Sequence, residues 1–184
     1  SEAHYYATRA KQVDRLSDIE VAAWFIYLNK TGFNGLYRVN KKNQFNVPFG
    51  KYENPPICDA ENLRACSRAL AGTDLHNEDF RTTAVRAKAG DFVYFDPPYA
   101  PLSETSNFTS YTVERFTAID QRMLRDRALQ LKELGVHVLI SNSSAEVIEK
   151  LYLGQGFEIE SVQARRNINS KASKRGAVEE FLIR

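Results

Sequence analysis

Four consecutive residues, Asp96-Pro97-Pro98-Tyr99, carry the clearest chemical signal in the sequence. The Asp96 carboxylate and a proline carbonyl can accept two hydrogen bonds from an amine, and Tyr99 can stack on a flat ring. The two prolines fix two φ angles and remove two backbone donors, so the chain must leave a sheet at this point. The set therefore suits a flat base that carries an exocyclic amine. The alternative is an ordinary strand-ending turn, because Asp and Pro are common turn residues.

The run Phe92–Phe95 directly before this tetrapeptide consists of large apolar residues. A short apolar run without alternation predicts a strand that is buried on both faces, as in a parallel sheet. Asp96 would then lie just past the carboxyl end of that strand, where open α/β sheets bind ligands. A helix over Ile119–Gly135 and a second buried strand over Val136–Ser141 are expected next. The sequence therefore predicts an α/β fold with its site at the end of the sheet.

The rest of the second half of the chain is predicted from shorter signals. Leu75–Phe80 is expected to form a short strand that ends in an acidic turn, and the polar loop 100–112 to act as a lid. Ser144 is expected to cap a helix that runs to Leu153. The last two strands are predicted over Phe157–Gln163 and Val178–Ile183, joined by a basic loop.

The first half of the chain is predicted to be mainly helical. A weakly amphipathic helix is expected from Tyr5 to Leu16. Ser17 and Glu20 match a capping box, and the apolar run Val21–Leu28 after it predicts a helix that is buried all round. A proline-containing linker is expected to follow residue 52, before a helix over Ala60–Ala71.

Between these helices, residues 36–50 predict a β-hairpin, because two stretches of alternating character flank a polar turn. Arg38 and Asn40 share one face of the first stretch. A polar hairpin face with an arginine can enter a major groove, where arginine pairs bidentately with guanine. The alternative is a hairpin whose polar face is merely solvated.

The net charge of +2 conceals an uneven distribution of charge. The windows 31–52 and 161–178 hold nine basic residues and no acidic residue, whereas the remainder holds 16 basic and 23 acidic residues. Two basic patches on an acidic body favour a polyanionic partner, although either window alone would suggest a solvated loop. The nine residues are Arg38, Lys41, Lys42, Lys51, Arg165, Arg166, Lys171, Lys174 and Arg175.

The composition, with 43% hydrophobic and 11% aromatic residues, predicts a folded domain. No stretch is apolar enough to predict a membrane span. Cys58 and Cys66 show no metal-ligand spacing and are expected to be reduced thiols in a cytoplasmic protein. The three histidines form no metal-binding pattern either, so no metal site is expected.

Five stretches of the chain, taken together, resemble a Dam-type (D12 class) DNA adenine-N6 methyltransferase. They cover most of the chain and follow the order of that family. The resemblance implies a Rossmann-like, S-adenosylmethionine-dependent methyltransferase sheet with a helical and β-hairpin DNA-recognition subdomain. It also implies a bacterial or phage-encoded, nucleoid-associated protein. The stretches are Asn34–Arg38, Phe45–Tyr52, Asp96–Ser103, Asn107–Thr109 and Leu139–Asn142.

The resemblance implies methyl transfer from S-adenosylmethionine to N6 of an adenine that is flipped out of duplex DNA, at a GATC-like site. Asp96, Pro97, Pro98 and Tyr99 would form the catalytic tetrapeptide, and Asp79, Phe80 and Asp96 would contact the cofactor. Arg38 would read a guanine, and Leu36 and Pro48 would contact a thymine methyl group. The residues expected to contact nucleic acid are Asn34, Leu36, Arg38, Asn40, Pro48, Lys51, Tyr52, Arg165, Arg166 and Lys171.

The chain departs from the family pattern at its start. Family members begin with a Lys-containing stretch and a Phe-x-Gly-x-Gly loop, whereas here no glycine precedes Gly32. We therefore expect a fragment without the N-terminal cofactor-binding segment. Such a fragment would bind cofactor weakly and would associate either with that segment or with itself. In the implied fold, Phe92–Phe95 would be an exposed apolar edge strand.

Two domains and two functions are expected. Residues 1–73 would form the target-recognition subdomain, and residues 74–184 the C-terminal part of the catalytic domain. The first function is that of an adenine methyltransferase, active when the missing segment is supplied. The second is that of a non-catalytic DNA-binding remnant of such an enzyme.

Overall fold

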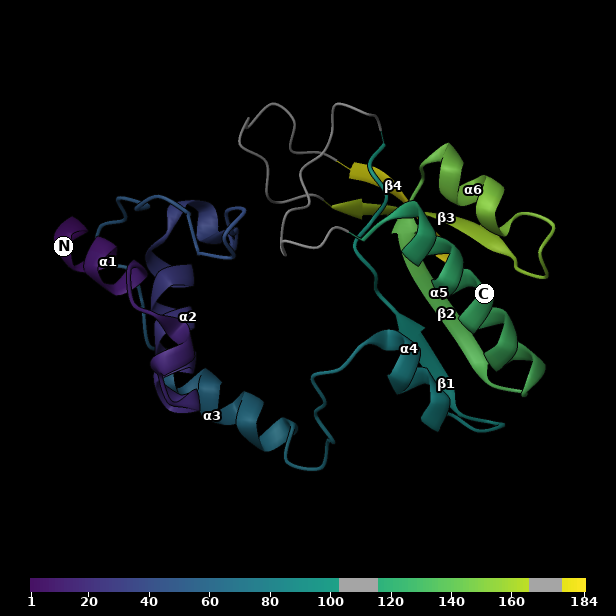
Figure 1. The fold of residues 1–184 in the computed structure, drawn as a ribbon, viewed down its shortest axis with the longest axis horizontal. Coiled ribbons are helices and arrows are strands. Elements are labelled where there is room, and N and C mark those ends of the chain that lie inside the picture. The colour runs from purple at the N-terminus through teal and green to yellow at the C-terminus, as the bar shows by residue number, and fades with distance from the viewer. Residues whose placement is uncertain (103–115, 166–176) are drawn as a thin grey trace. The chain divides into compact units, whose positions relative to one another are not determined.

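The computed structural model describes residues 1–102, 116–165 and 177–184, and the chain divides into two compact units. The first unit reaches His76 and the second begins at Asn77 (Figure 1). The expected domain boundary after residue 73 lies beside this division.

The first unit begins with a helix that is shorter than predicted. Helix α1 spans Glu2–Arg9 and is followed by the 3-10 turn η1, Val13–Arg15, so the expected helix over Tyr5–Leu16 was wrong at both ends. The Ser1 hydroxyl accepts a hydrogen bond from the His4 N–H and starts the helix earlier. At the other end the Trp24 indole donates to the Thr8 carbonyl at 2.9 Å, which occupies an acceptor that a longer helix would use.

Helix α2, Asp18–Thr31, begins at the predicted capping box, where the Glu20 carboxylate accepts from the Ser17 backbone N–H at 2.8 Å. The expectation that this helix is buried all round was wrong. Trp24 and Leu28 are buried, but Phe25 is 45% exposed. Helix α2 is exposed on one face because the core of this unit is small. Outside α2, the buried residues of that core come only from α1 and from residues 36–50. Helix α3, Ala60–Ala69, forms within the predicted range.

The segment 36–50 forms a hairpin-like loop whose pairing is irregular. Among the described residues here, isolated bridges join Val39 to Phe45 and Gly32 to Phe49, and no regular strand forms. The prediction of a two-stranded hairpin was therefore only partly correct. The second arm pairs with Arg38 and then switches to the end of α2, where the Gly50 N–H donates to the Thr31 carbonyl at 2.9 Å. The alternation held, because Val39 and Val47 are buried whereas Arg38 is exposed.

The second unit contains a four-stranded sheet in the order β1-β2-β4-β3, with all four strands labelled in Figure 1. The strands are β1, Phe92–Phe95; β2, His137–Ser143; β3, Ile159–Arg165; and β4, Ala177–Ile183. Strands β1 and β2 are parallel, and β4 runs antiparallel to both β2 and β3. The helical elements are α4, Phe80–Thr83; η3, Ala84–Arg86; α5, Ala118–Glu133; and α6, Glu146–Tyr152.

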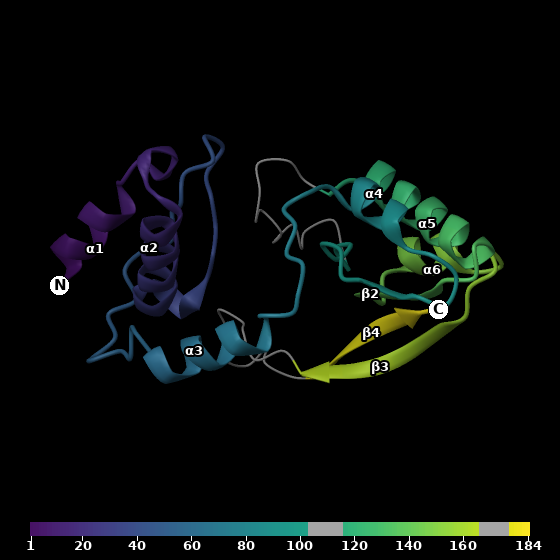
Figure 2. The ribbon, with the colours of Figure 1, turned by 90° about the horizontal axis from the view of Figure 1, so that it is seen from below.

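Helices α5 and α6 cover the same face of this sheet, as Figure 2 shows. Leu124 and Leu131 of α5 pack there with Ile140 of β2 and Ile148 of α6, all almost fully buried. Strand β1 forms an edge of the sheet, as expected. Its predicted burial on both faces was wrong, since Phe92 is 65% exposed and Tyr94 is 52% exposed. Val93 and Phe95, on the other face, pack against the core.

Two smaller predictions for this unit were also wrong. Leu75–Phe80 is not a strand: Leu75 is 71% exposed, and the Asp79 carboxylate accepts from the Arg81 N–H at 2.9 Å as α4 begins. Helix α6 begins after Ala145, not after Ser144. The polar loop from residue 103 and the basic loop 166–176 lie outside the described residues.

Candidate active site and nucleic-acid interface

The parallel pairing of β1 with β2 brings two polar segments together at the carboxyl ends of these strands. Phe95 aligns with Ile140, so Asp96 follows beside Ser141. The Ser141 hydroxyl donates to Asp96 Oδ1 at 2.8 Å and accepts from the Tyr94 hydroxyl at 2.9 Å. These side chains lie on the face away from α5. The Asp96 carboxylate is therefore oriented through one of its two oxygens.

Tyr99 is anchored on this same side through its hydroxyl, which donates to Glu180 Oε2 of β4 at 3.3 Å. Burial raises the pKa of the Tyr99 hydroxyl, and the nearby Glu180 and Asp96 carboxylates raise it further, whereas a hydrogen bond with Ser141 lowers it. Tyr99 therefore remains protonated at neutral pH and acts as a hydrogen-bond donor.

The backbone around Tyr99 is held from the opposite side by buried amides. Gln121 of α5 donates to the Pro98 carbonyl at 3.1 Å, and the Asn142 side-chain carbonyl accepts from the Ala100 N–H at 3.0 Å. The Ser143 hydroxyl donates to the Ala100 carbonyl at 2.6 Å. Residues from α5 and from β2 thus fix the course of the loop.

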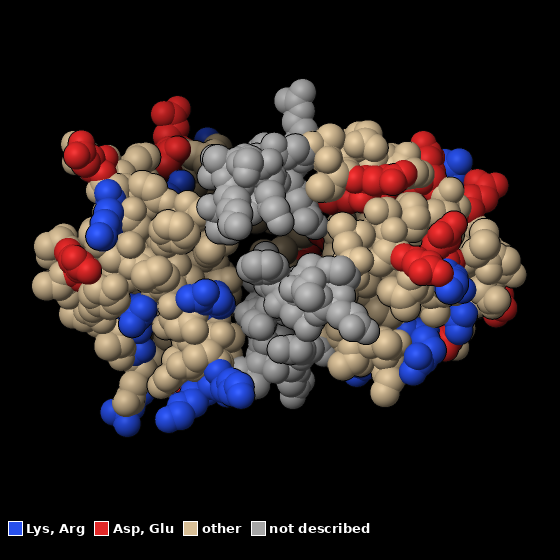
Figure 3. All heavy atoms as spheres, turned by 90° about the horizontal axis from the view of Figure 1, so that it is seen from above, with Lys and Arg blue, Asp and Glu red and all other residues tan. Residues whose placement is uncertain are grey.

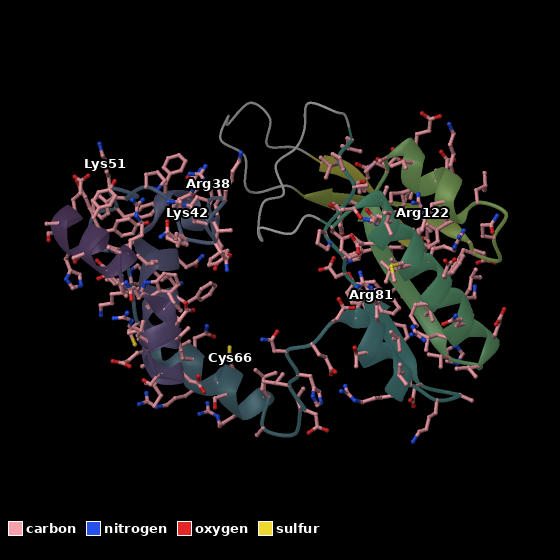
Figure 4. All side chains as sticks on the ribbon, viewed as in Figure 1. Arg38, Lys42, Lys51, Cys66, Arg81 and Arg122 are labelled. Atoms are coloured by element: carbon pink, nitrogen blue, oxygen red, sulfur yellow. The ribbon has the colours of Figure 1, made fainter. Side chains whose placement is uncertain are left out.

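The predicted cofactor residues Asp79 and Phe80 also reach the first turn of α5. Arg81 lies 3.4 Å from the Asp79 carboxylate and 2.6 Å from that of Asp120 (Figure 4). The centroid of the Phe80 ring lies 5.8 Å from that of Phe116, a residue just before α5. The Thr117 hydroxyl and backbone N–H, which accompany the capping box of α5, lower the pKa of Asp120.

The hydrogen-bond acceptors and the aromatic ring found here fit the cofactor that the sequence suggests. Two carboxylates, Asp79 and Asp96, can accept from hydroxyl or amino groups, and Phe80 offers an aromatic face. All three residues belong to the second unit. The described residues contain no cluster of side chains that could hold a metal ion.

The polar side chains of the 36–50 loop are arranged in pairs across it. The Arg38 guanidinium donates through Nε to Asn46 Oδ1 at 2.7 Å and through Nη2 to the Asn46 carbonyl at 3.2 Å. Asn40 donates to Gln44 Oε1 at 3.0 Å. Figure 4 shows Arg38 and Lys42 projecting from this loop. The loop therefore presents a partly ordered polar surface.

The other predicted nucleic-acid contacts of the first unit lie along the same chain segment. Asn34 has a left-handed backbone, with φ 54°. Leu36 packs partly against the core, while the exposed Pro48 offers its carbonyl to the Phe33 N–H. Lys51 also has a positive φ, 56°. Tyr52 lies so close to Gly50 that a Cβ there would come within 2.5 Å of the ring.

Charge is unevenly distributed on the first unit. On the face drawn in Figure 3, most of its Lys and Arg side chains lie toward the lower rim, and its Asp and Glu side chains toward the upper and outer parts. In the second unit, Arg165 ends β3 opposite Ala177. Arg166 and Lys171 lie outside the described residues.

Four residues of this site were given no role by the sequence analysis: Gln121, Ser141, Asn142 and Glu180. A signal existed for Ser141 and Asn142, because they lie at the end of the second predicted strand and in the family-like stretch Leu139–Asn142. Gln121 shares the apolar side of α5 with Leu124, Ala128 and Leu131, so a polar residue within that stripe was a signal as well. Nothing in the sequence pointed to Glu180, whose role depends on the pairing of β4.

Comparison with known proteins places these observations in a family. The sequence profile described as D12 class N6 adenine-specific DNA methyltransferase matches residues 1–168. The chain is 47% identical over 177 residues to the type II methyltransferase M1.LlaDCHI of Lactococcus lactis subsp. cremoris. It is 44% identical over 184 residues to the type II methyltransferase M.MjaIII of Methanocaldococcus jannaschii, and 37% identical over 178 residues to the DNA adenine methylase of Escherichia coli K12.

These alignments cover 95% of this chain for the first relative and 97% for the other two. They cover only 62% of the first relative and 63% of the others, so the chain spans less than two thirds of their length. No helix among the described residues is long and apolar enough to cross a membrane. The mixed sheet is consistent with a methyltransferase fold. On the profile match and these identities, the chain belongs to the D12 class of N6 adenine-specific DNA methyltransferases.

Proposed function

We propose that the protein carrying this chain transfers a methyl group from S-adenosylmethionine to N6 of an adenine that is flipped out of duplex DNA. The observation that carries the proposal is the Asp96–Tyr99 loop at the carboxyl end of β1, oriented by Ser141, Gln121 and Asn142. We further propose a GATC-like target, by analogy with the family pattern.

The cofactor, when bound, supplies an electrophilic methyl group on a sulfonium. In the proposal, Asp79 would accept hydrogen bonds from its polar groups and Phe80 would offer it an aromatic surface, while Asp96 would lie beside it and keep Oδ2 for the target amine. Arg81 holds the Asp79 carboxylate in place, because it lies between Asp79 and Asp120.

The acceptor loop acts on the target amine. The lone pair of N6 is delocalised into the adenine ring, which makes the amine a poor nucleophile. Since Ser141 occupies Oδ1 of Asp96, we assign Oδ2 to one N–H of the amine. Gln121 occupies the Pro98 carbonyl, so we assign the Pro97 carbonyl to the other N–H. These bonds strengthen as the nitrogen pyramidalises and becomes positive, and so stabilise the transition state in which the N6–carbon bond forms and the carbon–sulfur bond breaks. The sulfur would leave as a neutral thioether, and the methylated N6 would then release one proton to solvent.

Tyr99 holds the extruded base in this position. Its hydroxyl bond to Glu180 restrains the ring, and a stacked base gains about 1–3 kcal/mol from such an aromatic contact. That gain offsets part of the few kcal/mol needed to unstack the adenine. Tyr99 therefore selects for a base that has already left the helix.

The first unit serves target recognition in this proposal. Arg38 reads a guanine, and Leu36 and Pro48 contact a thymine methyl group. Asn34 lies near the space that the flipped base leaves. Asn40, Lys51 and Tyr52, with Arg165, Arg166 and Lys171, contact bases or the backbone. The pairing of Arg38 with Asn46 supports the assignment, because an ordered guanidinium loses less entropy on binding.

The test is incubation of the complete protein with isotopically labelled S-adenosylmethionine and a duplex that contains one GATC site. We expect label in N6-methyladenine, identified by mass spectrometry of the digested DNA. A duplex whose site is already N6-methylated on both strands is the control and should take up no label. Labelled cytosine, or labelled protein without labelled DNA, would contradict the proposal.

A further inference from the structure

Two buried amide side chains connect α5 to the loop that carries Tyr99. Asn142 is 0% exposed and Gln121 is 6% exposed. Buried amides destabilise a fold unless their polar atoms are hydrogen-bonded. Here each amide has a hydrogen-bond partner for its nitrogen and for its oxygen. The two amides bond to one another, and most of their other partners are backbone groups of the loop that carries Tyr99.

The orientation of both amides follows from the backbone. The Ala100 and Ser143 N–H groups can only donate, at 3.0 and 2.9 Å, so Asn142 must turn its oxygen toward them. Its nitrogen then donates to Gln121 Oε1 at 3.2 Å. Gln121 in turn has its nitrogen free for the Pro98 carbonyl, at 3.1 Å. The chain of bonds therefore has a single direction.

These hydrogen bonds fix the backbone on both sides of Tyr99. Gln121 holds the carbonyl before it, and Asn142 and Ser143 hold the N–H and carbonyl of Ala100 after it. Neither amide lies on the face that carries Asp96 and Ser141. Their influence on the chemistry must therefore pass through the position of the loop.

The same helical turn also reaches the proposed cofactor residues. Asp120, next to Gln121, accepts from Arg81 at 2.6 Å, and Arg81 lies 3.4 Å from Asp79. Arg127, further along α5, donates to the Arg81 carbonyl at 3.1 Å. The start of α5 thus fixes the acceptor loop and the segment around Asp79 relative to one another.

We propose that Gln121 and Asn142 are positioning residues for methyl transfer. They fix the position of the Pro98–Ala100 backbone, and through it the positions of the Tyr99 ring and of the Pro97 carbonyl that is assigned to the target amine. This inference rests on the proposed function. A purely structural role for the same pair would lower stability and ligand binding together, whereas a positioning role lowers the rate of the chemical step.

The first test uses Gln121→Met in the complete protein, which keeps the length of the side chain and removes both hydrogen bonds. We expect the single-turnover rate constant to fall at least about tenfold, since a misplacement of about 1 Å can cost about a hundredfold. The dissociation constants for duplex and for S-adenosylmethionine should change much less than this rate constant. Gln130→Met, on the exposed side of the same helix, is the matched control, because it removes a hydrogen bond from Arg127 Nη1 but none to the loop that carries Tyr99. An unchanged rate constant for Gln121→Met would overturn the proposal.

Gln121→Glu offers a rescue that a general loss of stability would not show. A protonated glutamic acid can donate to the Pro98 carbonyl and accept from Asn142, but a carboxylate can only accept. We therefore expect the rate of Gln121→Glu, relative to wild type, to recover as the pH is lowered. Gln130→Glu should show no such recovery, and a flat profile for Gln121→Glu would count against the role of the donated bond.

Hydrogen exchange of the Ala100 amide provides a readout that does not depend on activity. We expect slow exchange in the wild-type protein and faster exchange in Gln121→Met and Asn142→Leu. If the wild-type protein methylates no adenine, the proposed function fails, yet faster Ala100 exchange in Gln121→Met would still support the positioning. An unprotected Ala100 amide in the wild-type protein would overturn it.

Discussion

Replacing Asp96 tests the proposed chemistry most directly. Asp96→Ala removes the acceptor for the target amine. Asp96→Asn keeps the size but leaves one acceptor oxygen for two partners, the amine and the Ser141 hydroxyl, which now bonds Oδ1 at 2.8 Å. Loss of one acceptor that acts in the transition state costs about a hundredfold in rate, equivalent to about 2.7 kcal/mol. We expect both variants to lose at least that much.

Ser141→Ala should cost less, because it leaves the Asp96 carboxylate in place and removes one hydrogen bond to it, worth about 1.5 kcal/mol or about tenfold in rate. Combining it with Asp96→Asn frees the single amide oxygen for the amine. The double variant should therefore lose less than the product of the two single effects. Such a result would show that the two partners compete for one acceptor.

The assay is single-turnover methyl transfer with the complete protein in excess over a duplex with one target adenine. Duplex affinity is measured in parallel and should change little. Asp91→Asn, at the other end of β1, is the control, since an amide can still accept from the Lys88 N–H there. A near wild-type rate for Asp96→Asn would refute the assignment of Asp96 as the amine acceptor.

Three further predictions concern recognition, association and pH. Arg38→Ala should cost about 1–3 kcal/mol of discrimination at one base pair, whereas Lys41→Ala should weaken binding to all duplexes alike. The measurement is the affinity of each variant for the target duplex and for duplexes that differ from it by one base pair. Equal losses of affinity on every duplex for Arg38→Ala would exclude base reading. The chain should self-associate through β1, because β1 lies at an edge of the described sheet and exposes Phe92 and Tyr94. Phe92→Lys should then lower the mass measured by light scattering, and a wild-type chain that is monomeric at high concentration would contradict this prediction. The pKa of Asp120 is lowered by Thr117 and Arg81, so its stabilising effect is full at neutral pH and is lost as the pH falls through that lowered pKa. The difference in Tm between wild type and Asp120→Asn should therefore shrink below about pH 4. A difference that does not change with pH would contradict a stabilising role for the negative charge of Asp120.

The sequence predicted those elements whose signal is local. The apolar runs located β1 and β2, the helical spacing located α5, and the Ser17–Glu20 pair located the start of α2. The position of Asp96 at the end of β1 followed from these. Each of these features is determined by neighbours in the chain, so a pattern over a few residues was sufficient.

What the sequence could not predict depends on contacts between distant residues. The partner of Asn142 is Gln121, on a different element, and the partner of Tyr99 is Glu180, which reaches it only through the pairing of β4. The 36–50 loop looked like a regular hairpin because alternation does not reveal that its second arm switches partner at the end of α2. The exposure of Phe92 and Tyr94 likewise depends on which strand lies beside them.

The order of the strands has a consequence for folding. Strand β4 is synthesised after β1, β2 and β3, yet it lies between β2 and β3 and supplies the pairing that joins them. A nascent chain that ends before β4 can pair β1 with β2, but β3 has no place in the sheet until β4 inserts. Such non-local pairing slows folding, because the entropy of closing a long loop is lost before the contacts that stabilise the pairing can form. Tyr99 therefore gains its Glu180 partner only when the sheet closes, which makes this contact a late event in the maturation of the protein.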